Sequence, residues 1–349
     1  MSGYVKEFIS QARYGGRCMT AWNLNWEVSG KRIGNFDAVS LYPSAMARIS
    51  IATGKPQVLK MTGLENMTEV FSVTDSLGKS HQINLPIILK WLQNKNNATD
   101  YFVDVEITKV GKILNFPLVL ARTKNGNQYI NDHIHPEFYT DSDDQKAKNI
   151  DVKYTKDGNI INTYSKIELE DLVKFQRVEF RVRRGYYYTG EVNKSIQGVI
   201  KDLFKMRYDL QNEVNDEGII DRNTLKEIIK LLMNSLYGKS IQKTITTKSF
   251  YKTQEEHDSY CIKKYNKIVK SKKINDDLYE VILRQNIDKQ FSLVQLGVNI
   301  LSMSKRIMNE VMTLAFDLKI PIYYQDTDSM HIELDGINPK QMNLRKTII

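Results

Sequence analysis

The sequence is poor in cysteine and has no long apolar run. Its two cysteines, Cys18 and Cys261, lie far apart, and neither belongs to a zinc-ligand pattern. This excludes a disulfide scaffold and a zinc module, and it is compatible with a reducing compartment. No segment approaches the about 20 consecutive apolar residues that span a bilayer, and the N-terminus lacks the apolar core of a signal peptide. We therefore expect an intracellular, soluble protein without a membrane partner.

Acidic residues are outnumbered by basic ones. The chain has 50 Lys and Arg against 41 Asp and Glu, which gives a net charge of +9. Such a balance suits a polyanion held through sequence-independent phosphate contacts, although many lysine-rich proteins bind no polyanion. With 349 residues, of which 41% are hydrophobic, the chain can bury a sizeable core in two or three subdomains.

Two carboxylates stand close together near the end of the chain, in YYQDTDS. Alternating apolar residues before Asp326 and after Asp328 predict a β-hairpin with Asp-Thr-Asp at its bend. No Lys or Arg lies inside this segment to neutralise the two charges. A cation is therefore their natural partner, and Mg²⁺ prefers such oxygen ligands. Taken alone, an Asp-x-Asp is also common in turns that are merely solvated.

A third carboxylate, Asp37, follows residues 32–36, which predict a short buried strand. Pro43 then predicts a turn that opens a helix carrying Met46 and Ile49. This places Asp37 at a strand end, beside backbone N–H groups that can receive phosphate oxygens. Tyr42 is either a ring under an incoming sugar, which leaves no room for a 2′-hydroxyl, or an ordinary half-buried aromatic.

The clearest helix is predicted at residues 224–238, where Thr224 and Glu227 form a capping box and Gly238 marks the end. Lys230, Asn234 and Tyr237 share one face of this helix. A lysine, an amide and a ring in line suit a triphosphate, a sugar and a base pair. A lone lysine on a helix, however, is most often a solvated charge.

A second helix is predicted at residues 195–215, ending at Asp216-Glu217-Gly218. Together the two helices predict an antiparallel hairpin. Its first helix presents Lys201, Lys205, Arg207 and Gln211 near Lys230. Arg207 is a second candidate for a triphosphate contact, and an exposed cation on an amphipathic helix is the equal alternative.

Three motifs thus occur in a fixed order: NFDAVSLYPS around Asp37, KLLMNSLYGK from Lys230, and YYQDTDSMHIE around Asp326. Together they resemble the A, B and C motifs of family B DNA polymerases. The resemblance implies an α+β fold, in which a palm of antiparallel sheet backed by helices carries a helical-hairpin fingers subdomain. It also implies template-directed DNA synthesis from dNTPs with two Mg²⁺ ions, or with Mn²⁺ in their place.

The resemblance further assigns roles by position. It implies that Asp37, Asp326 and Asp328 are catalytic, that Asp37 and Asp328 bridge the metals, and that the backbone of Ala38 lies near the metal. The implied nucleotide-binding residues are Ser40, Leu41, Tyr42 as sugar gate, Arg207, Lys230 as triphosphate ligand, Asn234 and Tyr237. The implied DNA contacts are Ser235 and Gly238 beside the template base, and Tyr324 and Thr327 beside the primer terminus.

Tyr14-Gly15-Gly16 is similar to the Tyr-Gly-Gly element that precedes motif A in this family and touches the template strand. Paired glycines let the backbone approach phosphates closely, although Gly-Gly beside arginine is also a plain turn.

The intervals between the motifs are longer than a compact palm and fingers require. The extra material resembles the two terminal-protein-region insertions of protein-primed viral and plasmid polymerases, which guide the priming protein and encircle the template. We expect palm at 1–110, the first insertion with palm strands at 111–185, fingers at 186–240, the second insertion at 241–290 and palm again at 291–349. Surface insertions without a special role are the alternative.

Two further segments are expected to be scaffold. Ser292 and Gln295 predict the cap of a long helix that reaches Leu318 beneath the motif C hairpin. Tyr101–Ile107 predicts a palm strand, and we assign its Asp104 and Glu106 to an exposed face.

The sequence departs from the family at both ends. Thirteen residues precede Tyr14 and twenty follow Ser329. The 3′–5′ exonuclease, with its proofreading, and most of the thumb are therefore expected to be absent, and Lys346-Thr347-Ile348 is not the family's Lys-x-Tyr element.

Two functions follow from the resemblance. The first is DNA synthesis from a DNA or protein primer in viral or plasmid replication, located in the host cytoplasm. Its partners would be primer-template DNA, dNTPs, a terminal priming protein and a second polypeptide supplying thumb or exonuclease. The alternative is a catalytically incomplete, DNA-binding fragment or subunit that needs the second chain.

Overall fold

The computed structural model describes residues 3–65, 68–149, 153–212, 222–242, 247–284 and 293–335. Two compact units make up the chain, one comprising Met1–Tyr237 and Val294–Ile349 and the other Gly238–Leu293. The first unit contains the three aspartates singled out by the sequence, so the candidate site is described within it.

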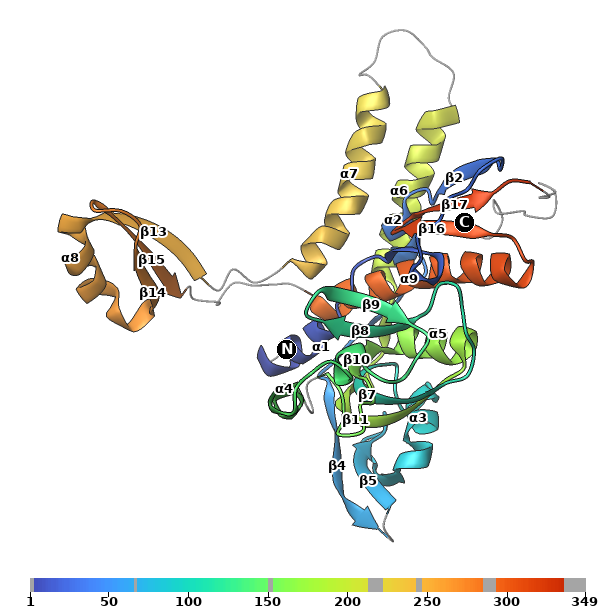
Figure 1. Ribbon diagram of the computed structural model, residues 1–349, viewed down its shortest axis with the longest axis horizontal. Helices are drawn as coiled ribbons and strands as arrows, with labels where there is room; N and C mark the ends of the chain where they lie inside the picture. Colours follow the sequence, from blue (N-terminus) through green and yellow to red (C-terminus); the bar gives the residue numbers. More distant parts are fainter. Residues whose placement is uncertain are drawn as a thin grey trace. The chain divides into compact units, whose positions relative to one another are not determined.

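A four-stranded antiparallel sheet carries these aspartates (Figure 1). Its strands follow the order β1 (Cys18–Thr20), β16 (Ile322–Asp326), β17 (Ser329–Glu333) and β2 (Ile33–Asp37). The hairpin expected around Asp-Thr-Asp is confirmed, because β16 and β17 pair with Asp326 opposite Ser329. The alternating pattern fixes it, since Ile322, Met330 and Ile332 are all buried.

Strand β2 is not the buried strand that the sequence predicted. It is the last strand of the sheet, and Ile33 and Phe36 are 42% and 39% exposed. An edge strand has a neighbour on one side only, so its apolar residues need not be covered.

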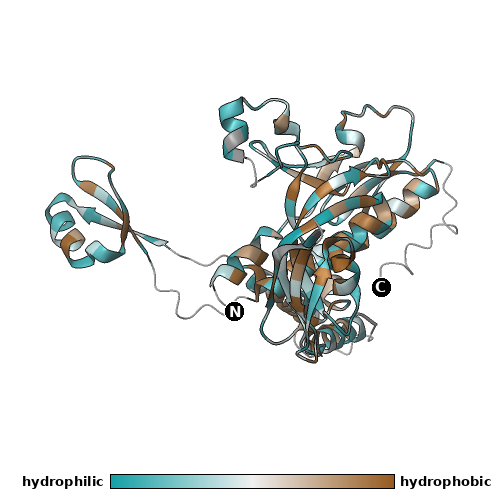
Figure 2. Ribbon diagram, turned by 90° about the horizontal axis from the view of Figure 1, so that it is seen from below, coloured by the Kyte–Doolittle hydropathy of each residue, from teal (hydrophilic) through white to brown (hydrophobic). Residues whose placement is uncertain are grey.

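Two helices pack with this sheet in one hydrophobic core. The long helix expected before the hairpin is present as α9 (Val294–Asp317), while Ser292 lies outside the described residues. Helix α2 (Leu41–Met46) packs on α9 and ends before Ile49. Residues of both helices and of the sheet share one core. Figure 2 shows hydrophobic residues on many of the helices and strands of the first unit.

The two expected fingers helices are α6 (Ser195–Asn212) and α7 (Arg222–Ile241). The rest of the range 195–215 and the turn at 216–218 lie outside the described residues. Helix α7 begins before Thr224 and continues beyond Gly238, so the predicted cap and end were both wrong. An interior glycine costs a helix only about 1 kcal/mol.

A second sheet of the first unit has six antiparallel strands. Their order is β10 (Ile161–Ser165), β7 (Asp100–Val110), β11 (Val178–Tyr188), β4 (Gln57–Glu65), β5 (Thr68–Thr74) and β6 (Ser80–Asn84). Helices α3 (Leu85–Gln93) and α5 (Lys166–Gln176) pack against it. Helix α5 begins where the sequence allows a reciprocal cap, because Ser165 and Glu168 bond each other's backbone N–H groups.

Residues 101–107 form a strand, as predicted, but not a strand of the sheet that carries Asp37. They belong to β7, which pairs with β10 and β11. Asp104 is buried rather than on an exposed face, and its carboxylate lies 2.7 Å from the Nε of Arg184. An alternating pattern predicts a strand but does not name its partners.

The remaining elements of the first unit are short. They are α1 (Gly3–Gln11), α4 (Asp143–Asn149), the pair β3 (Ile51–Ala52) and β12 (Val192–Asn193), the hairpin of β8 (Val119–Thr123) and β9 (Gly126–Ile130), and the 3₁₀ turns Ala21–Asn23 and Pro136–Phe138.

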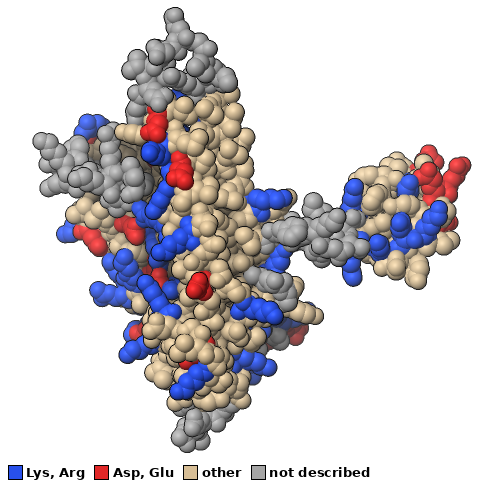
Figure 3. All heavy atoms as spheres, turned by 180° about the vertical axis from the view of Figure 1, so that it is seen from behind, with Lys and Arg blue, Asp and Glu red and all other residues tan. Residues whose placement is uncertain are grey.

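The second unit covers the range expected for the second insertion. Strands β13 (Thr247–Thr253), β15 (Leu278–Arg284) and β14 (Ile268–Lys273) form its antiparallel sheet, joined by α8 (Gln254–Lys264) and the 3₁₀ turn Tyr265–Lys267. Acidic side chains gather at one end of this unit and basic ones along its side (Figure 3). Across the described residues of both units, no helix is long and apolar enough to cross a membrane.

Candidate active site

The three aspartates lie at one end of the four-stranded sheet. Asp37 is the last residue of β2 and stands opposite Ser329, the residue after Asp328. Asp326 ends β16 and stands opposite Cys18 of β1. The Ala38 N–H donates a 2.7 Å hydrogen bond to the Asp328 carbonyl oxygen, which ties the turn to the end of β2. Strand register therefore brings together residues that are almost 300 positions apart.

The turn between Asp326 and Asp328 is tight. Thr327 has φ 51°, in the left-handed region that β-branched residues rarely adopt. Its N–H donates to the carbonyl oxygen of Arg17 at 2.8 Å, and the Ser329 hydroxyl donates to the Asp326 carbonyl oxygen at 3.2 Å. These contacts project the two carboxylates from a fixed backbone.

Repulsion and partial burial raise the pKa of the Asp328 carboxyl above its ordinary value. Burial is the larger cause, and the charges of Asp37 and then Asp326 add to it. Within the described part of the chain, no group of three or more His, Cys, Asp or Glu side chains is arranged to hold a metal ion by itself. The site offers the neighbouring carboxylates of Asp37 and Asp328 instead. This fits Mg²⁺, which is commonly held by one or two protein carboxylates together with substrate phosphates and water.

A cavity of about 1090 Å³ opens beside these carboxylates, between β2, β17, α2, α6 and α9. Asp37, Ala38 and Asp328 lie on its wall. Apolar side chains of α9 and of the sheet also line it, among them Met308, Val311, Met330 and Ile332. The basic side chains on its wall are Arg48, Lys201, Lys205 and Arg207. The cavity thus has carboxylates on one part of its wall and basic side chains on another. Cations held by the carboxylates and the basic side chains could together bind a negatively charged substrate.

Arg207 is held next to motif A. Its Nη1 donates a 3.0 Å hydrogen bond to the Ser40 hydroxyl. Ser40 precedes α2 with φ 54°, and its hydroxyl does not cap that helix. The structure therefore brings Arg207, Ser40 and Asp37 to the same cavity region, while Leu41 is buried beneath it.

Tyr42 and Tyr237 form a stacked pair, with ring centroids 4.1 Å apart and planes 7° from parallel. Tyr42 comes from α2 and Tyr237 from α7. Burial raises the pKa of both hydroxyls, and the Asp328 charge contributes to the shift of Tyr42. Motifs A and B, which are predicted from separate segments, thus meet ring on ring close to the carboxylates.

The other motif B residues lie along α7 and are exposed. The Lys230 ammonium lies 3.8 Å from the Glu227 carboxylate one turn away, so its role as triphosphate ligand stays a prediction. Asn234 is exposed on the same helix. The Ser235 hydroxyl donates to the Leu231 carbonyl oxygen at 2.7 Å, which leaves it only as an acceptor for DNA. Gly238 is exposed and begins the second unit.

The Tyr14 side chain is packed in the core, and the predicted contact of this residue with a template strand stays a prediction. Tyr14 is 1% exposed, and its hydroxyl donates to the Thr163 carbonyl oxygen at 2.8 Å. A sequence with an aromatic residue before two glycines is compatible with a ring packed in the core and equally with a ring stacked on a base. Gly15 and Gly16 are exposed, and Tyr324 packs its ring edge-on to His331, so their DNA contacts stay predictions.

Sequence reasoning missed several residues around the site. Arg48 lines the cavity and forms an ion pair with Glu310 at 3.3 Å. It lies two residues after the end of α2, where no motif of the sequence singled it out. Lys305 and Arg17 are buried under the sheet with partners from distant segments, for which the sequence holds no local signal.

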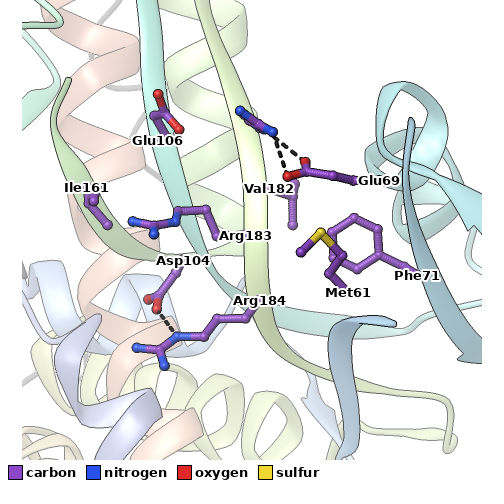
Figure 4. A pocket seen from close by; sticks show the side chains of 10 residues that line it. Met61, Glu69, Phe71, Asp104, Glu106, Ile161, Val182, Arg183 and Arg184 are labelled. Atoms are coloured by element: carbon purple, nitrogen blue, oxygen red, sulfur yellow. Dashed lines mark hydrogen bonds and ion pairs between the residues drawn. The ribbon is translucent and has the colours of Figure 1, made fainter. Parts of the chain in front are cut away.

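A second cavity, of about 380 Å³, lies away from the aspartates on the six-stranded sheet (Figure 4). Arg184 pairs there with Asp104, Arg181 pairs with Glu69, and Arg183 extends between Asp104 and Glu106. Acidic and basic groups balance one another in this cavity. It therefore lacks the exposed single-sign charge of a polyanion site.

Comparisons with known proteins agree with the geometry. Residues 1–315 match the family model for DNA polymerase type B, organellar and viral. The fold resembles that of Phi29 DNA polymerase in its orthorhombic crystal form, with a TM-score of 0.55, 16% identity, and coverage of 98% of this chain and 46% of that one. The complex of Phi29 DNA polymerase with primer-template DNA and incoming nucleotide substrates gives a TM-score of 0.57 at 15% identity, with 98% and 46% coverage. This chain thus spans less than half the length of those structures. No curated protein matches it.

Proposed function

Because the chain belongs to the organellar and viral type B DNA polymerases, we propose that it catalyses template-directed nucleotidyl transfer from dNTPs to a primer 3′-OH. The observation that carries this proposal is the meeting of Asp37 and Asp328 at the end of one sheet, on the wall of a cavity lined also by Lys201, Lys205 and Arg207. A binding module for nucleic acid has no need of unneutralised carboxylates where phosphates would bind.

Asp37 and Asp328 would hold two divalent ions, with the backbone of Ala38 nearby and Asp326 in support. Ions held there would activate the primer hydroxyl and neutralise charge on the leaving pyrophosphate. Family B polymerases generally use divalent metals, and Mg²⁺ suits this all-oxygen ligand set, with Mn²⁺ as its replacement.

The basic side chains of the cavity would bind the triphosphate. Arg207 is positioned by its bond to Ser40, and Lys201 and Lys205, one helical turn apart on α6, line the same cavity. Arginine offers a planar fork for phosphate oxygens, while lysine acts as a point charge. Lys230 would join them when a nucleotide draws its ammonium away from Glu227, because a triphosphate outweighs one exposed carboxylate.

The stacked Tyr42 and Tyr237 rings would form the floor of the sugar and base site. A ring fixed by a parallel neighbour cannot turn aside for a 2′-hydroxyl, so deoxynucleotides are favoured. Asn234 and Leu41 would complete the nucleotide pocket.

Primer-template DNA is the proposed macromolecular partner. Phi29 DNA polymerase has a similar fold in its complex with primer-template DNA and in its complex with primer-template DNA and incoming nucleotide substrates. We extend those partners to this chain, with Gly15, Gly16 and Tyr324 as DNA contacts. The primer would be DNA or a terminal priming protein, and a second polypeptide would supply clamping of the duplex.

Asp328→Asn tests the proposal, because it removes one charge while preserving the side-chain shape. We expect the parent protein to extend a primer with dNTPs and Mg²⁺, weakly and distributively. The variant should lose extension by roughly three orders of magnitude, since metal positioning and charge neutralisation carry most of the rate. Asp144→Asn, at an exposed position of α4, is the matched control and should extend like the parent.

DNA binding without metal separates the two functions. Asp328→Asn should bind primer-template at least as tightly as the parent, because a negative charge has been removed from the site. Equal extension by variant and parent would reject the metal assignment. A parent that binds DNA but never extends it, even with excess enzyme and Mn²⁺, would favour the incomplete subunit instead.

A further inference from the structure

The backbone of Thr327 is held in a conformation that its own side chain disfavours. Its φ of 51° belongs to the left-handed region, which glycine and asparagine tolerate but a β-branched residue rarely adopts. Such conformations persist only where surrounding structure determines them. The turn between Asp326 and Asp328 therefore needs a second segment to hold it.

Gly16 and Arg17 provide that segment. The Arg17 carbonyl oxygen accepts the Thr327 N–H at 2.8 Å, and the next residue, Cys18, begins the pairing of β1 with β16 opposite Asp326. Gly16 lies so close that a Cβ on it would stand 2.5 Å from the Thr327 Cγ2, 2.6 Å from Oγ1 and 2.8 Å from Cβ. Rotation of the threonine side chain would move Cγ2 and Oγ1 but not Cβ.

Arg17 fixes the position of this segment. Its side chain is buried, and its guanidinium donates to the carbonyl oxygens of Phe116 at 3.1 Å and Pro117 at 3.0 Å, and to the Asn309 side chain of α9. Burial lowers the pKa of Arg17 to about 10, so the group remains charged at neutral pH. The Arg17 backbone therefore cannot shift without breaking a buried set of charged hydrogen bonds.

We propose that Gly16 is a positioning residue: its missing side chain lets the Gly16–Arg17 backbone seat Thr327, and this seating sets the spacing of the Asp326 and Asp328 carboxylates for divalent cations. The inference rests on the proposed function for its metal, but the steric fit does not depend on catalysis.

The two ends of the turn explain why the seating matters. Asp328 is tied to Ala38 by the 2.7 Å bond, and Asp326 is tied to β1 by strand pairing. Displacing Thr327 between these fixed points must rotate one carboxylate against the other. Divalent ions bound by few protein ligands are sensitive to such rotation, because Mg²⁺ and Mn²⁺ demand near-octahedral oxygen geometry.

A double-mutant cycle tests the fit with Gly16→Ala, Thr327→Gly and the combination of both. Thr327→Gly removes all three atoms that a Cβ at position 16 would meet, and it accepts the left-handed φ without strain. Gly15→Ala is the matched control, because a Cβ at the adjacent glycine would meet no atom within 4 Å. Mn²⁺ affinity without DNA is measured by electron paramagnetic resonance, and stability by urea unfolding.

Gly16→Ala is expected to weaken Mn²⁺ binding at least tenfold, and the double variant to recover to within threefold of Thr327→Gly. Gly15→Ala should retain the parental Mn²⁺ affinity, although it shares the predicted DNA contact. Unchanged Mn²⁺ affinity in folded Gly16→Ala, or a double variant no better than Gly16→Ala, would overturn the proposal.

The urea cycle decides the matter if Gly16→Ala does not fold or if the parent binds no Mn²⁺. Rescue of folding by Thr327→Gly would support the steric fit even in a protein without polymerase activity, and a double variant that also fails to fold would refute it. Failure of the proposed function is recognised separately, as absent primer extension by the parent with both metals.

Discussion

Asp100 gives a prediction whose size follows from the structure. This carboxylate is buried at the start of β7, where it accepts hydrogen bonds from the Asn299 side chain at 2.6 Å and from the Tyr101 N–H at 2.9 Å. Burial raises the pKa of Asp100 to about 6, more than its hydrogen bonds lower it. Replacing it by asparagine removes the charge and keeps the shape.

The sign follows from proton binding. The folded protein holds the Asp100 proton up to about pH 6, whereas the unfolded chain releases it near its ordinary pKa of 3.8. The contribution of Asp100 to the free energy of unfolding therefore falls as pH rises from about 4 to 6 and is constant above that. Each pKa unit corresponds to about 1.4 kcal/mol, so the neutral-pH penalty is about 3 kcal/mol. Asp100→Asn should not show this loss of stability, because the asparagine carries no charge at any of these pH values.

The asparagine can be accommodated. The Asn299 Oδ1 is buried without a partner, so a flip of that amide would present an acceptor to the new amide group. The Tyr101 N–H keeps its acceptor. We therefore expect the stability of Asp100→Asn relative to the parent to rise by about 3 kcal/mol between pH 4 and pH 7.

Urea unfolding at several pH values, followed by tryptophan fluorescence, measures this difference. All three tryptophans, Trp22, Trp26 and Trp91, lie in the first unit, so the signal reports the unit that contains Asp100. Asp144→Asn, at an exposed position of α4, is the control for removal of an acidic group. Parallel pH profiles for Asp100→Asn and the parent would refute the reasoning.

Two predictions concern the nucleotide pocket. Tyr42→Ala should admit ribonucleotides in primer extension. Tyr42→Phe should still exclude them, because the ring stacked on Tyr237 remains. Equal discrimination between ribose and deoxyribose in both variants would show that the Tyr42 ring is not the sugar gate. Arg207→Ala should raise the KM for dNTPs about tenfold to a hundredfold, in line with a charged hydrogen bond of about 1.5–3 kcal/mol, and Arg207→Lys should recover part of the loss. An unchanged KM in single-nucleotide kinetics would place the Arg207 guanidinium outside the triphosphate site.

Much of the site was predictable because its signals are local. Period-two alternation around a short turn predicts the β16–β17 hairpin, and helical spacing predicts α6 and α9 without knowledge of their neighbours. The placement of Asp37 beside Asp328 is not local. It followed only from the family resemblance, and the β2–β17 register bears it out.

What failed depends on long-range pairing. The strand at 101–107 was recognised, but its alternation is equally compatible with either sheet, and the partners β10 and β11 come from later in the chain. The burial of Tyr14 was not foreseen either, because its hydroxyl bonds the carbonyl oxygen of Thr163, 149 positions away. A sequence read without tertiary partners assigns such a ring to solvent or to DNA.

Buried ion pairs connect α9, which packs with the four-stranded sheet, to α5, which packs on the six-stranded sheet. Arg306 of α9 pairs with Asp171 of α5 at 2.6 Å and with Glu170 at 2.9 Å, and Lys305 pairs with Glu168. Both basic groups lie at least half buried, as do Asp171 and Glu168. Removing one partner of such a pair costs about 3–5 kcal/mol, because the other charge stays buried and unpaired.

The same reasoning extends to the turn that carries Asp326 and Asp328. Arg17, whose carbonyl seats Thr327, donates to residues 116 and 117, which lie in the range expected for the first insertion. Asn309 links Arg17 to Asp171 through a 3.0 Å bond. A chain shortened across residues 111–185 would leave Arg17, Lys305 and Arg306 without most of their partners. Residues 116 and 117 therefore help to hold the Asp326–Asp328 turn in place through Arg17, whatever the origin of the range around them.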